Sequence, residues 1–269
     1  RRPLETTQGM RVPAIYVANP YMLECNEDWY VPHDVDRDVS PYPQQHITES
    51  DITFDPSTVS FPQPRYPRAT VGYADTAPTE EIPLDCISDW YSYFNSRGYA
   101  SVFCGGLGTR GSQGFNCCGS PEETAAFKAV IDWLNGRCRA FTNLTDNIEI
   151  RADWCTGKVA MSGKSYLGTM CIAVASTGVE GLETIIPEAA ISNWYDYYRC
   201  NGLNLPAIGW QGDDLDILAK YCFSRAKDPE DYASVREAYA AWLEGIAADE
   251  DRDSGNYSRW WDMRNYLKA

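Results

Sequence analysis

The sequence has few basic residues, few histidines and no long apolar run. Its 23 Lys and Arg residues stand against 38 Asp and Glu residues, which gives a formal net charge of −15. Nucleic acids and anionic membranes bind basic surfaces, so we expect neither as a partner. No stretch approaches the roughly 18 consecutive apolar residues that a membrane-spanning helix requires, so no membrane span is expected either.

The sequence also lacks the patterns of a metal site. Its ten cysteines form no Cys-x-x-Cys pair, and the two histidines, His33 and His46, lie far from any pair of cysteines. We therefore expect no metal and no cofactor. The chain starts at Arg1 without an initiator methionine or the apolar stretch of a signal peptide, so it looks like the middle of a longer protein. Reduced thiols and a cytoplasmic location are the expectation.

Strands and helices alternate over the first 200 residues. The expected elements are a strand at 12–18, a helix at 84–97, a strand at 99–104, a helix from 120 to 136, a strand at 158–162, a helix at 166–176 and a strand at 182–190. This alternation is typical of an α/β protein with a mostly parallel sheet and helices on both faces. Residues 24–82 interrupt it as a long irregular excursion rich in Pro, Asp, Thr and Ser.

The helix that starts at Ser120 has the strongest local signal in the chain. Ser120 is placed to cap the helix, Pro121 occupies its first turn, and Glu123 stands at the position that completes a capping box. In such a box the glutamate side chain accepts the N–H of the capping serine. The sequence therefore predicts where this helix begins.

The alternation ends near residue 200. Residues 213–225, 229–248 and 256–267 each have the spacing of an amphipathic helix, with no strand between them. We therefore expect residues 1–200 to be the first part of an α/β domain. Residues 201–269 would then form a helical insertion or lid.

Two glycine-rich segments could bind nucleotides. Gly106 to Gly111 matches G-x-G-x-x-G, but eight residues separate it from the capped helix that should meet a pyrophosphate. Gly157 to Ser165 resembles a phosphate-binding loop, but five residues of strand-like composition separate its glycines, where that loop has four. A nucleotide-binding protein therefore remains only a third alternative.

A nucleophile elbow fits the second segment better. Gly163, Lys164 and Ser165 lie between an expected strand and an expected helix, which is the context of such an elbow. The serine would adopt a strained backbone, and the N–H of Tyr166 at the helix start would point at a developing oxyanion. The usual elbow has glycine two residues after the serine, whereas here it stands three after, at Gly168. The pattern alone leaves an ordinary strand-to-helix turn equally open.

The segment 163–169, Gly-Lys-Ser-Tyr-Leu-Gly-Thr, resembles the nucleophile motif of the X-prolyl dipeptidyl aminopeptidases. Their wider family includes the cocaine esterase and the α-amino acid ester hydrolases. Five further blocks resemble the X-prolyl enzymes: 130–136, 178–183, 191–199, 212–216 and 264–267. The resemblance covers residues 10–20 and 84–269. It implies part of an α/β-hydrolase fold and a serine peptidase that releases X-Pro dipeptides from peptide N-termini through an acyl-enzyme, without a cofactor.

The resemblance also implies roles for residues around the elbow. Ser165 would be the nucleophile, with the backbone N–H of Tyr166 and the hydroxyl of Tyr21 as oxyanion donors. Without the resemblance, Tyr21 would be taken for a surface tyrosine.

The same resemblance implies a substrate-binding site. Trp194 and Tyr197, three residues apart and so on one helical face, would line a slot for proline. Trp210 would wall the pocket that receives the free amino group of the substrate. Asp213 would pair with the free amino group of the substrate, and Asp214 could replace it. From the sequence alone, Trp194 and Tyr197 would more often be core residues.

A serine needs a base, and the chain has no suitable histidine. His33 and His46 both precede Ser165, whereas the acid and the histidine of α/β-hydrolases follow the serine. The resemblance places both beyond residue 269, so we expect the chain alone to be inactive and its sheet edge to be prone to aggregation. It also implies a cytoplasmic enzyme, peptides with proline at the second position as substrates, and a homodimer as a candidate assembly.

Two other functions stay open. The first is an esterase or amidase of the same wider family, which a comparison of X-Pro and X-Ala anilides with simple esters would reveal. The second is a non-catalytic binding module that has kept the fold. Such a module would lack a histidine in the segments that follow residue 269.

Overall fold

The computed structural model describes residues 1–21, 90–109, 112–142, 147–199, 202, 214–225 and 229–269. The chain divides into two compact units. Arg1–Val12 belongs to the first, which contains η1 (Leu4–Gln8) and α1 (Trp90–Asn95). The second unit, Pro13–Tyr30 and Val102–Ala269, contains every described residue of the candidate site.

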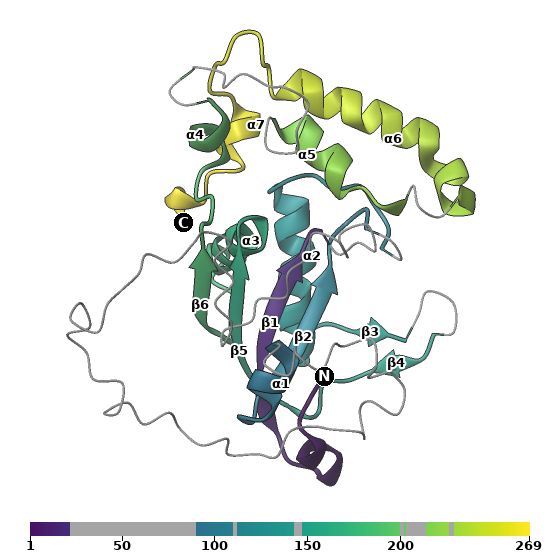
Figure 1. Cartoon of the computed structure of the whole chain (residues 1–269), viewed down its shortest axis with the longest axis vertical. Coiled ribbons are helices and arrows are strands. Elements are labelled where there is room, and N and C mark those ends of the chain that lie inside the picture. Colours follow the sequence, from purple (N-terminus) through teal and green to yellow (C-terminus); the bar gives the residue numbers. More distant parts are fainter. Residues whose placement is uncertain (22–89, 110–111, 143–146, 200–201, 203–213, 226–228) are drawn as a thin grey trace, which may run out of the picture. The chain divides into compact units, whose positions relative to one another are not determined.

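The core is a four-stranded sheet of β1 (Val12–Asn19), β2 (Ala100–Gly105), β5 (Cys155–Lys164) and β6 (Leu182–Glu188), in the order β2-β1-β5-β6. β5 and β6 pair in parallel, and the arrows of all four strands point the same way in Figure 1. β1 is buried almost throughout, as expected of an inner strand of a parallel sheet. The expected α/β class with a mostly parallel sheet is confirmed, as are the four strands.

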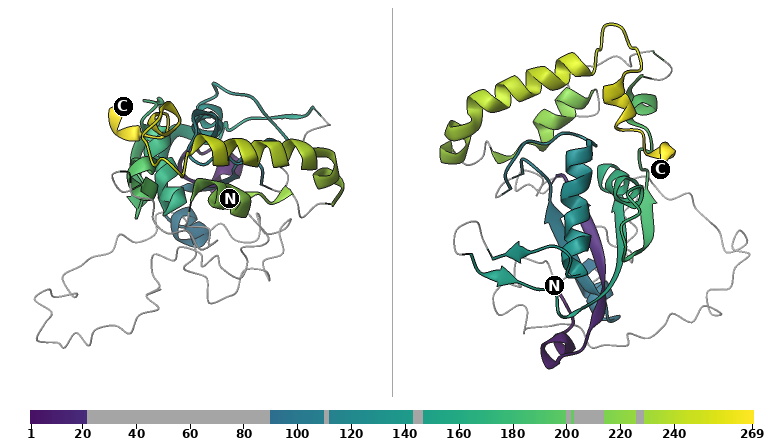
Figure 2. Two further views of the ribbon diagram at one scale, coloured as in Figure 1. Left: turned by 90° about the horizontal axis from the view of Figure 1, so that it is seen from above. Right: turned by 180° about the vertical axis from the view of Figure 1, so that it is seen from behind.

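The helices α2 (Pro121–Leu134) and α3 (Tyr166–Ala175) lie side by side on one face of the sheet, where both pack on β5 (Figure 2). α2 begins as the sequence predicts, because the Ser120 side chain accepts the N–H of Glu123. Its buried stripe continues through Phe127, Ile131 and Leu134 at helical spacing. α3 is buried on nearly every side, since it carries almost only apolar residues.

A small antiparallel pair, β3 (Ala140–Phe141) and β4 (Glu149–Ile150), stands apart from the main sheet. Sequence reasoning did not predict it. Each strand has only two residues, which is too short for an alternating pattern.

Among the described residues, those after β6 form only helices: α4 (Trp194–Arg199), α5 (Leu215–Cys222), α6 (Pro229–Asp249), α7 (Arg259–Asp262) and η8 (Tyr266–Lys268). They gather beyond the carboxyl ends of β1 and β5 (Figure 1). α5 and α6 confirm two of the expected helices.

The expected single helix over 256–267 is wrong, because a turn at Met263 and Arg264 and an extended Asn265 separate α7 from η8. Asn265 forms a β-bridge with Asn193, just before α4. The N–H of Tyr266 donates to Ser192 O at 3.0 Å, and the N–H of Trp194 donates to Arg264 O at 3.3 Å. These backbone groups bond to the start of α4 instead of to their own helix.

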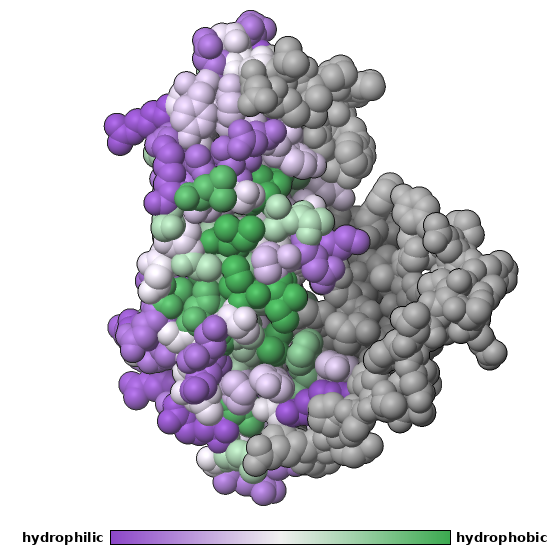
Figure 3. Space-filling model, turned by 90° about the vertical axis from the view of Figure 1, so that its left-hand side faces the viewer, coloured by the Kyte–Doolittle hydropathy of each residue, from purple (hydrophilic) through white to green (hydrophobic). Residues whose placement is uncertain are grey.

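β6 ends the strand order of the sheet. Figure 3 views the side on which β6 lies and shows apolar side chains gathered there. Ile186 is 53% exposed. The expectation that this edge promotes aggregation stays a prediction. Within the described residues, no helix combines the length and the apolar character that crossing a membrane requires.

Candidate active site

Ser165 is the single residue between the last residue of β5 and the first residue of α3. Its φ of 59° and ψ of −124° lie in a region that side chains other than glycine rarely adopt. Its N–H donates to Glu188 O at 2.8 Å, and its carbonyl accepts the N–H of Thr169 at 2.9 Å. The side chain is exposed. The backbone of Ser165 is thus held by β6 and by α3, and its side chain lies at the surface.

Two glycines make this sharp bend sterically feasible. A Cβ on Gly163 would lie 2.5 Å from the Cβ of Leu167, in the first turn of α3. A Cβ on Gly168 would lie 2.7 Å from the carbonyl oxygens of both Gly163 and Glu188. Because β6 approaches α3 at residue 168, glycine is needed three residues after the serine. This contact explains the departure from the usual elbow pattern.

Tyr21 reaches Ser165 from the end of the neighbouring strand. The Asn19 side chain accepts the N–H of Tyr21 at 2.8 Å, which closes a tight turn around Pro20 at the end of β1. The Ser165 side chain lies close enough to the Tyr21 phenol to influence its pKa. Burial raises the pKa of Tyr21 well above its usual range, and Ser165 acts in the opposite direction. The phenol is therefore protonated at neutral pH and can donate a hydrogen bond.

The side chain of Tyr166 points into the protein, below the elbow. Its hydroxyl donates to the two carboxylate oxygens of Glu123, at 2.7 and 2.9 Å. Its ring meets the ring of Tyr21 edge to face, with centroids 5.5 Å apart, and that of Trp194 at 5.1 Å. Tyr166 therefore links the elbow to the rest of the core.

Sequence reasoning missed the role of Glu123. The carboxylate does not close a capping box on Ser120 but accepts the N–H of Gly119 at 2.6 Å and the hydroxyl of Tyr166. Glu123 is completely buried, and burial raises its pKa to about 6 against the lowering effect of these hydrogen bonds. One signal could have revealed it: Glu123 falls in line with the buried apolar stripe of α2.

Trp194 and Tyr197 both lie on α4 but differ in exposure. Trp194 is 0% exposed; its indole N–H donates to the hydroxyl of Tyr266 at 3.0 Å, and its ring stacks on Tyr198. It lies directly against Gly119, where there is no room for a Cβ. Tyr197, in contrast, is 51% exposed. The place of Trp194 is the core position that the sequence alone favoured.

Several predicted residues lie outside the described residues: Trp210, Asp213, His33 and His46. Asp214 is described and is buried. It forms ion pairs with Arg199 at 3.0 Å and Arg252 at 2.8 Å, and its side chain accepts the N–H of Leu215 at the start of α5. Its carboxylate is therefore already engaged, and the idea that Asp214 could replace Asp213 is wrong.

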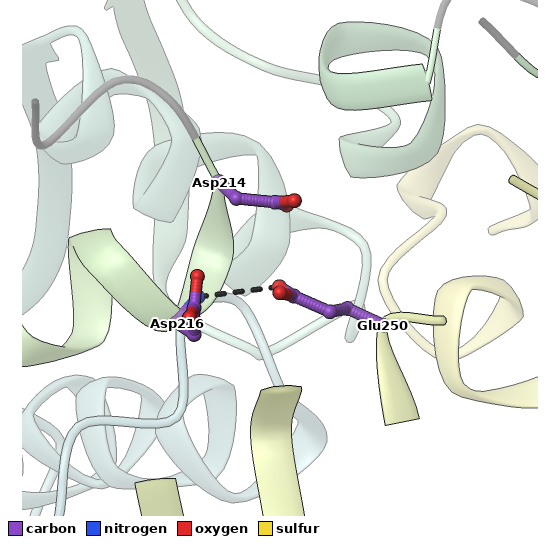
Figure 4. Close-up of side chains that lie close together, drawn as sticks. All are labelled: Asp214, Asp216 and Glu250. Carbon is purple, nitrogen blue, oxygen red and sulfur yellow. Dashed lines mark hydrogen bonds between the residues drawn. The ribbon is translucent and has the colours of Figure 1, made fainter. Parts of the chain in front are cut away.

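Asp214 belongs to a group of three carboxylates with Asp216 and Glu250, shown in Figure 4. One oxygen of each lies within 4.8 Å of the others, close enough to suggest a metal site. Arg252 also contacts Asp216 at 3.0 Å and Glu250 at 3.3 Å. Burial, together with the two aspartates, raises the pKa of Glu250 to about 9.

Glu250 is therefore protonated at neutral pH. The guanidinium groups of Arg199 and Arg252 form ion pairs with Asp214 and Asp216. A metal would require deprotonated ligands and would compete with both arginines. We interpret this group as an ion network that joins the start of α5 to the ends of α4 and α6.

The whole chain, residues 1–269, matches the sequence model of the X-Pro dipeptidyl-peptidase (S15) family. It is 45% identical over 268 residues to the Xaa-Pro dipeptidyl-peptidase of Pediococcus pentosaceus, covering 99% of this chain and 32% of that protein. The corresponding protein of Lacticaseibacillus casei is 44% identical over 267 residues, with coverage of 99% and 33%. The chain thus spans about a third of the length of these relatives.

The similarity to solved structures is weaker. A CocE/NonD family hydrolase from Staphylococcus aureus has a TM-score of 0.39 and 16% identity, covering 71% of this chain and 24% of that one. A selenomethionine-labelled α-amino acid ester hydrolase has a TM-score of 0.41 and 15% identity, with coverage of 96% and 36%.

Proposed function

This chain belongs to the X-Pro dipeptidyl-peptidase (S15) family, and from that premise we propose that it is part of a serine exopeptidase. The enzyme would release X-Pro dipeptides from the N-termini of peptides. The observation that supports this most is Ser165 itself, a strained, exposed serine at a strand-to-helix junction, next to the phenol of Tyr21.

The reaction would proceed through an acyl-enzyme. The Ser165 oxygen attacks the carbonyl carbon of the substrate proline while a base removes the hydroxyl proton. The resulting tetrahedral oxyanion collapses, the peptide C–N bond breaks, and the rest of the peptide leaves with a proton as a free amine. Water then attacks the ester carbonyl and frees both the X-Pro dipeptide and Ser165. We propose that the base and its orienting acid come from residues outside this chain.

We propose that two groups stabilise the oxyanion. Tyr166 is the first residue of α3, so its N–H has no partner within the helix and lies at the positive end of the helix dipole. The hydroxyl of Tyr21 already reaches the side chain of Ser165. Donors held in place before the reaction cost no reorganisation in the transition state, which makes them effective.

Substrate recognition would involve the segment after α4. We propose that Tyr197, exposed on α4, lines the proline slot, that Trp194 supports this slot from the core, and that Trp210 walls the pocket for the amino group of the substrate. Asp213 would pair with the free ammonium group of the substrate. A dipeptidyl peptidase needs such an anion, because the ammonium group marks the distance of two residues from the end of the peptide.

Three further proposals concern the setting of the enzyme. They are a cytoplasmic location, substrates with proline at the second position, and a homodimer. The absence of a membrane-crossing helix among the described residues is compatible with the first.

Turnover by the full-length enzyme tests the proposed function. We expect cleavage of X-Pro anilides well above X-Ala anilides and simple esters. Ser165→Ala should lower kcat by about 10⁶-fold. A preference for simple esters would identify an esterase of the wider family instead. Absence of any turnover would favour a binding module and end the proposal.

A further inference from the structure

Glu123 is a buried carboxylate without a direct ion-pair partner among the described residues. Its hydrogen-bond partners in the described part of the chain are neutral: the hydroxyl of Tyr166, the side-chain amide of Asn116 at 3.4 Å and the N–H of Gly119 at 2.6 Å. Burying a carboxylate without an ion-pair partner costs free energy. A carboxylate kept at this cost is expected to have a further role.

We propose that Glu123 is a positioning residue that aims both oxyanion donors of the elbow. It would act on Tyr166 directly and on Tyr21 through the ring of Tyr166. This inference rests on the proposed function, because it assigns a role in the same reaction. Glu123 itself would touch neither the substrate nor the reacting atoms.

The first step is the hydrogen bond from Tyr166. A phenol that donates to a carboxylate forms a charge-assisted bond, which is shorter and stronger than a neutral one, and both distances here are below 3 Å. Tyr166 directly follows Ser165 and opens α3. Fixing its side chain to α2 therefore fixes the direction of its backbone N–H.

The second step is the contact between the rings of Tyr166 and Tyr21. Their planes meet at 84° with centroids 5.5 Å apart, an edge-to-face arrangement that has a preferred geometry. Trp194 contacts the ring of Tyr166 at 82°, so this ring cannot shift without displacing its neighbours. The orientation of Tyr166 thus limits where the Tyr21 hydroxyl can lie.

The third step is the support of Glu123 itself. The guanidinium of Arg264 donates to the carbonyls of Cys117 and Cys118 at 3.0 and 2.9 Å, and the hydroxyl of Tyr266 donates to the carbonyl of Gly119 at 2.7 Å. Arg264 and Tyr266 therefore hold the loop that contains Gly119, whose N–H donates to Glu123. The positive charge of Arg264 also lowers the pKa of the Glu123 carboxyl, in opposition to burial.

A glutamine could not replace this glutamate. One carboxylate oxygen accepts from Gly119 and the other from Asn116, while Tyr166 donates to both. A glutamine in the same place would turn its NH₂ group toward at least one of these donors. Glu123→Gln should therefore loosen Tyr166 with almost no change in volume.

The experiment uses the full-length enzyme with four variants: Glu123→Gln, Tyr166→Phe, the double variant and the control Glu122→Gln. Glu122→Gln makes the same chemical change in the same helical turn. Glu122, however, is exposed and accepts a hydrogen bond from the Ser120 hydroxyl. The measurements are kcat and KM on an X-Pro anilide, and inhibition by a dipeptide boronic acid ending in boroproline. The serine adduct of this inhibitor carries an oxygen in the oxyanion position.

We expect Glu123→Gln to lower kcat by roughly 10- to 100-fold, because misaimed donors lose transition-state stabilisation. KM should change by less than about twofold, and boronate inhibition should weaken in proportion to kcat. Tyr166→Phe should show the same fall in kcat, the same small change in KM and the same weakening of boronate inhibition. The double variant should be no worse than either single variant, since both remove one interaction.

An unchanged kcat in Glu123→Gln, or a loss confined to KM, would overturn the inference. If that variant does not fold, Tyr166→Phe decides by the same criteria, because it removes the same hydrogen bond from the other side. Failure of the proposed function is distinguishable: it requires a wild-type enzyme without X-Pro turnover, or an active Ser165→Ala variant.

Discussion

The side chains of Tyr21 and Ser165 are neighbours, although one residue follows β1 and the other follows β5. β1 and β5 are neighbours in the sheet and run in the same direction (Figure 1). Their carboxyl ends therefore meet at one edge, where open α/β sheets commonly bind ligands. The pair is the centre of the proposed oxyanion site.

Tyr21→Phe tests this relationship in the full-length enzyme. It removes the hydroxyl and keeps the ring that packs on Tyr166. We expect kcat on an X-Pro anilide to fall by about 100-fold with little change in KM, since the lost bond acts on the oxyanion. Tyr232→Phe, on α6, is the matched control and should leave kcat unchanged. A Tyr21→Phe enzyme with wild-type kcat would remove Tyr21 from the site.

Gly168→Ala tests the steric account of the elbow. The added Cβ would meet two backbone oxygens at 2.7 Å, so we expect the protein to lose about 1–3 kcal/mol of unfolding free energy. Gly245→Ala is a helical control on α6 with open space around its Cβ, and it should be neutral or gain up to about 1 kcal/mol. Urea denaturation measures both. Equal effects of the two changes would contradict the close approach of β6 to α3.

Glu250→Gln tests the ion network of Figure 4. The folded protein holds the Glu250 proton until about pH 9, whereas a carboxyl with the ordinary pKa of 4.5 releases it much earlier. The unfolded state thus binds fewer protons between these values, so Glu250 makes the folded state less stable as pH rises through this window. The slope from this one group is at most about 1.4 kcal/mol per pH unit.

We therefore expect the Glu250→Gln protein to lose less stability than wild type between pH 5 and pH 8. Urea midpoints at several pH values provide the measurement. Glu244→Gln, an exposed change on α6, is the control and should follow the wild-type curve. A Glu250→Gln curve parallel to wild type would mean that Glu250 is ionised in the fold.

The 269-residue chain alone should not turn over X-Pro anilides. A serine hydroxyl is a poor nucleophile without a base, and the only histidines, His33 and His46, precede Ser165 in the chain. Incubation of the purified chain at high concentration, beside its Ser165→Ala variant as blank, measures this. Turnover above the blank would show that the chain contains its own base.

Local signals predicted much of the fold. The Ser120 cap and Pro121 marked the start of α2, and the strand-glycine-serine-helix order placed Ser165 at its bend. Both signals depend only on residues that are close in sequence, so long-range packing affects these two local structures little. The helix expected at 256–267 failed because long-range backbone pairing of Asn265 with Asn193 replaced local helical bonds.

The same division applies to the candidate site. The sequence by itself determined that Ser165 follows a strand and opens a helix, since backbone geometry and glycine spacing are local properties. Only the tertiary structure decided that Glu123 turns to Tyr166 and that Trp194 is buried against Gly119. Such contacts depend on which helices pack together. The spacing of residues along the chain indicates which face of a helix is buried, but it does not specify the partner helix.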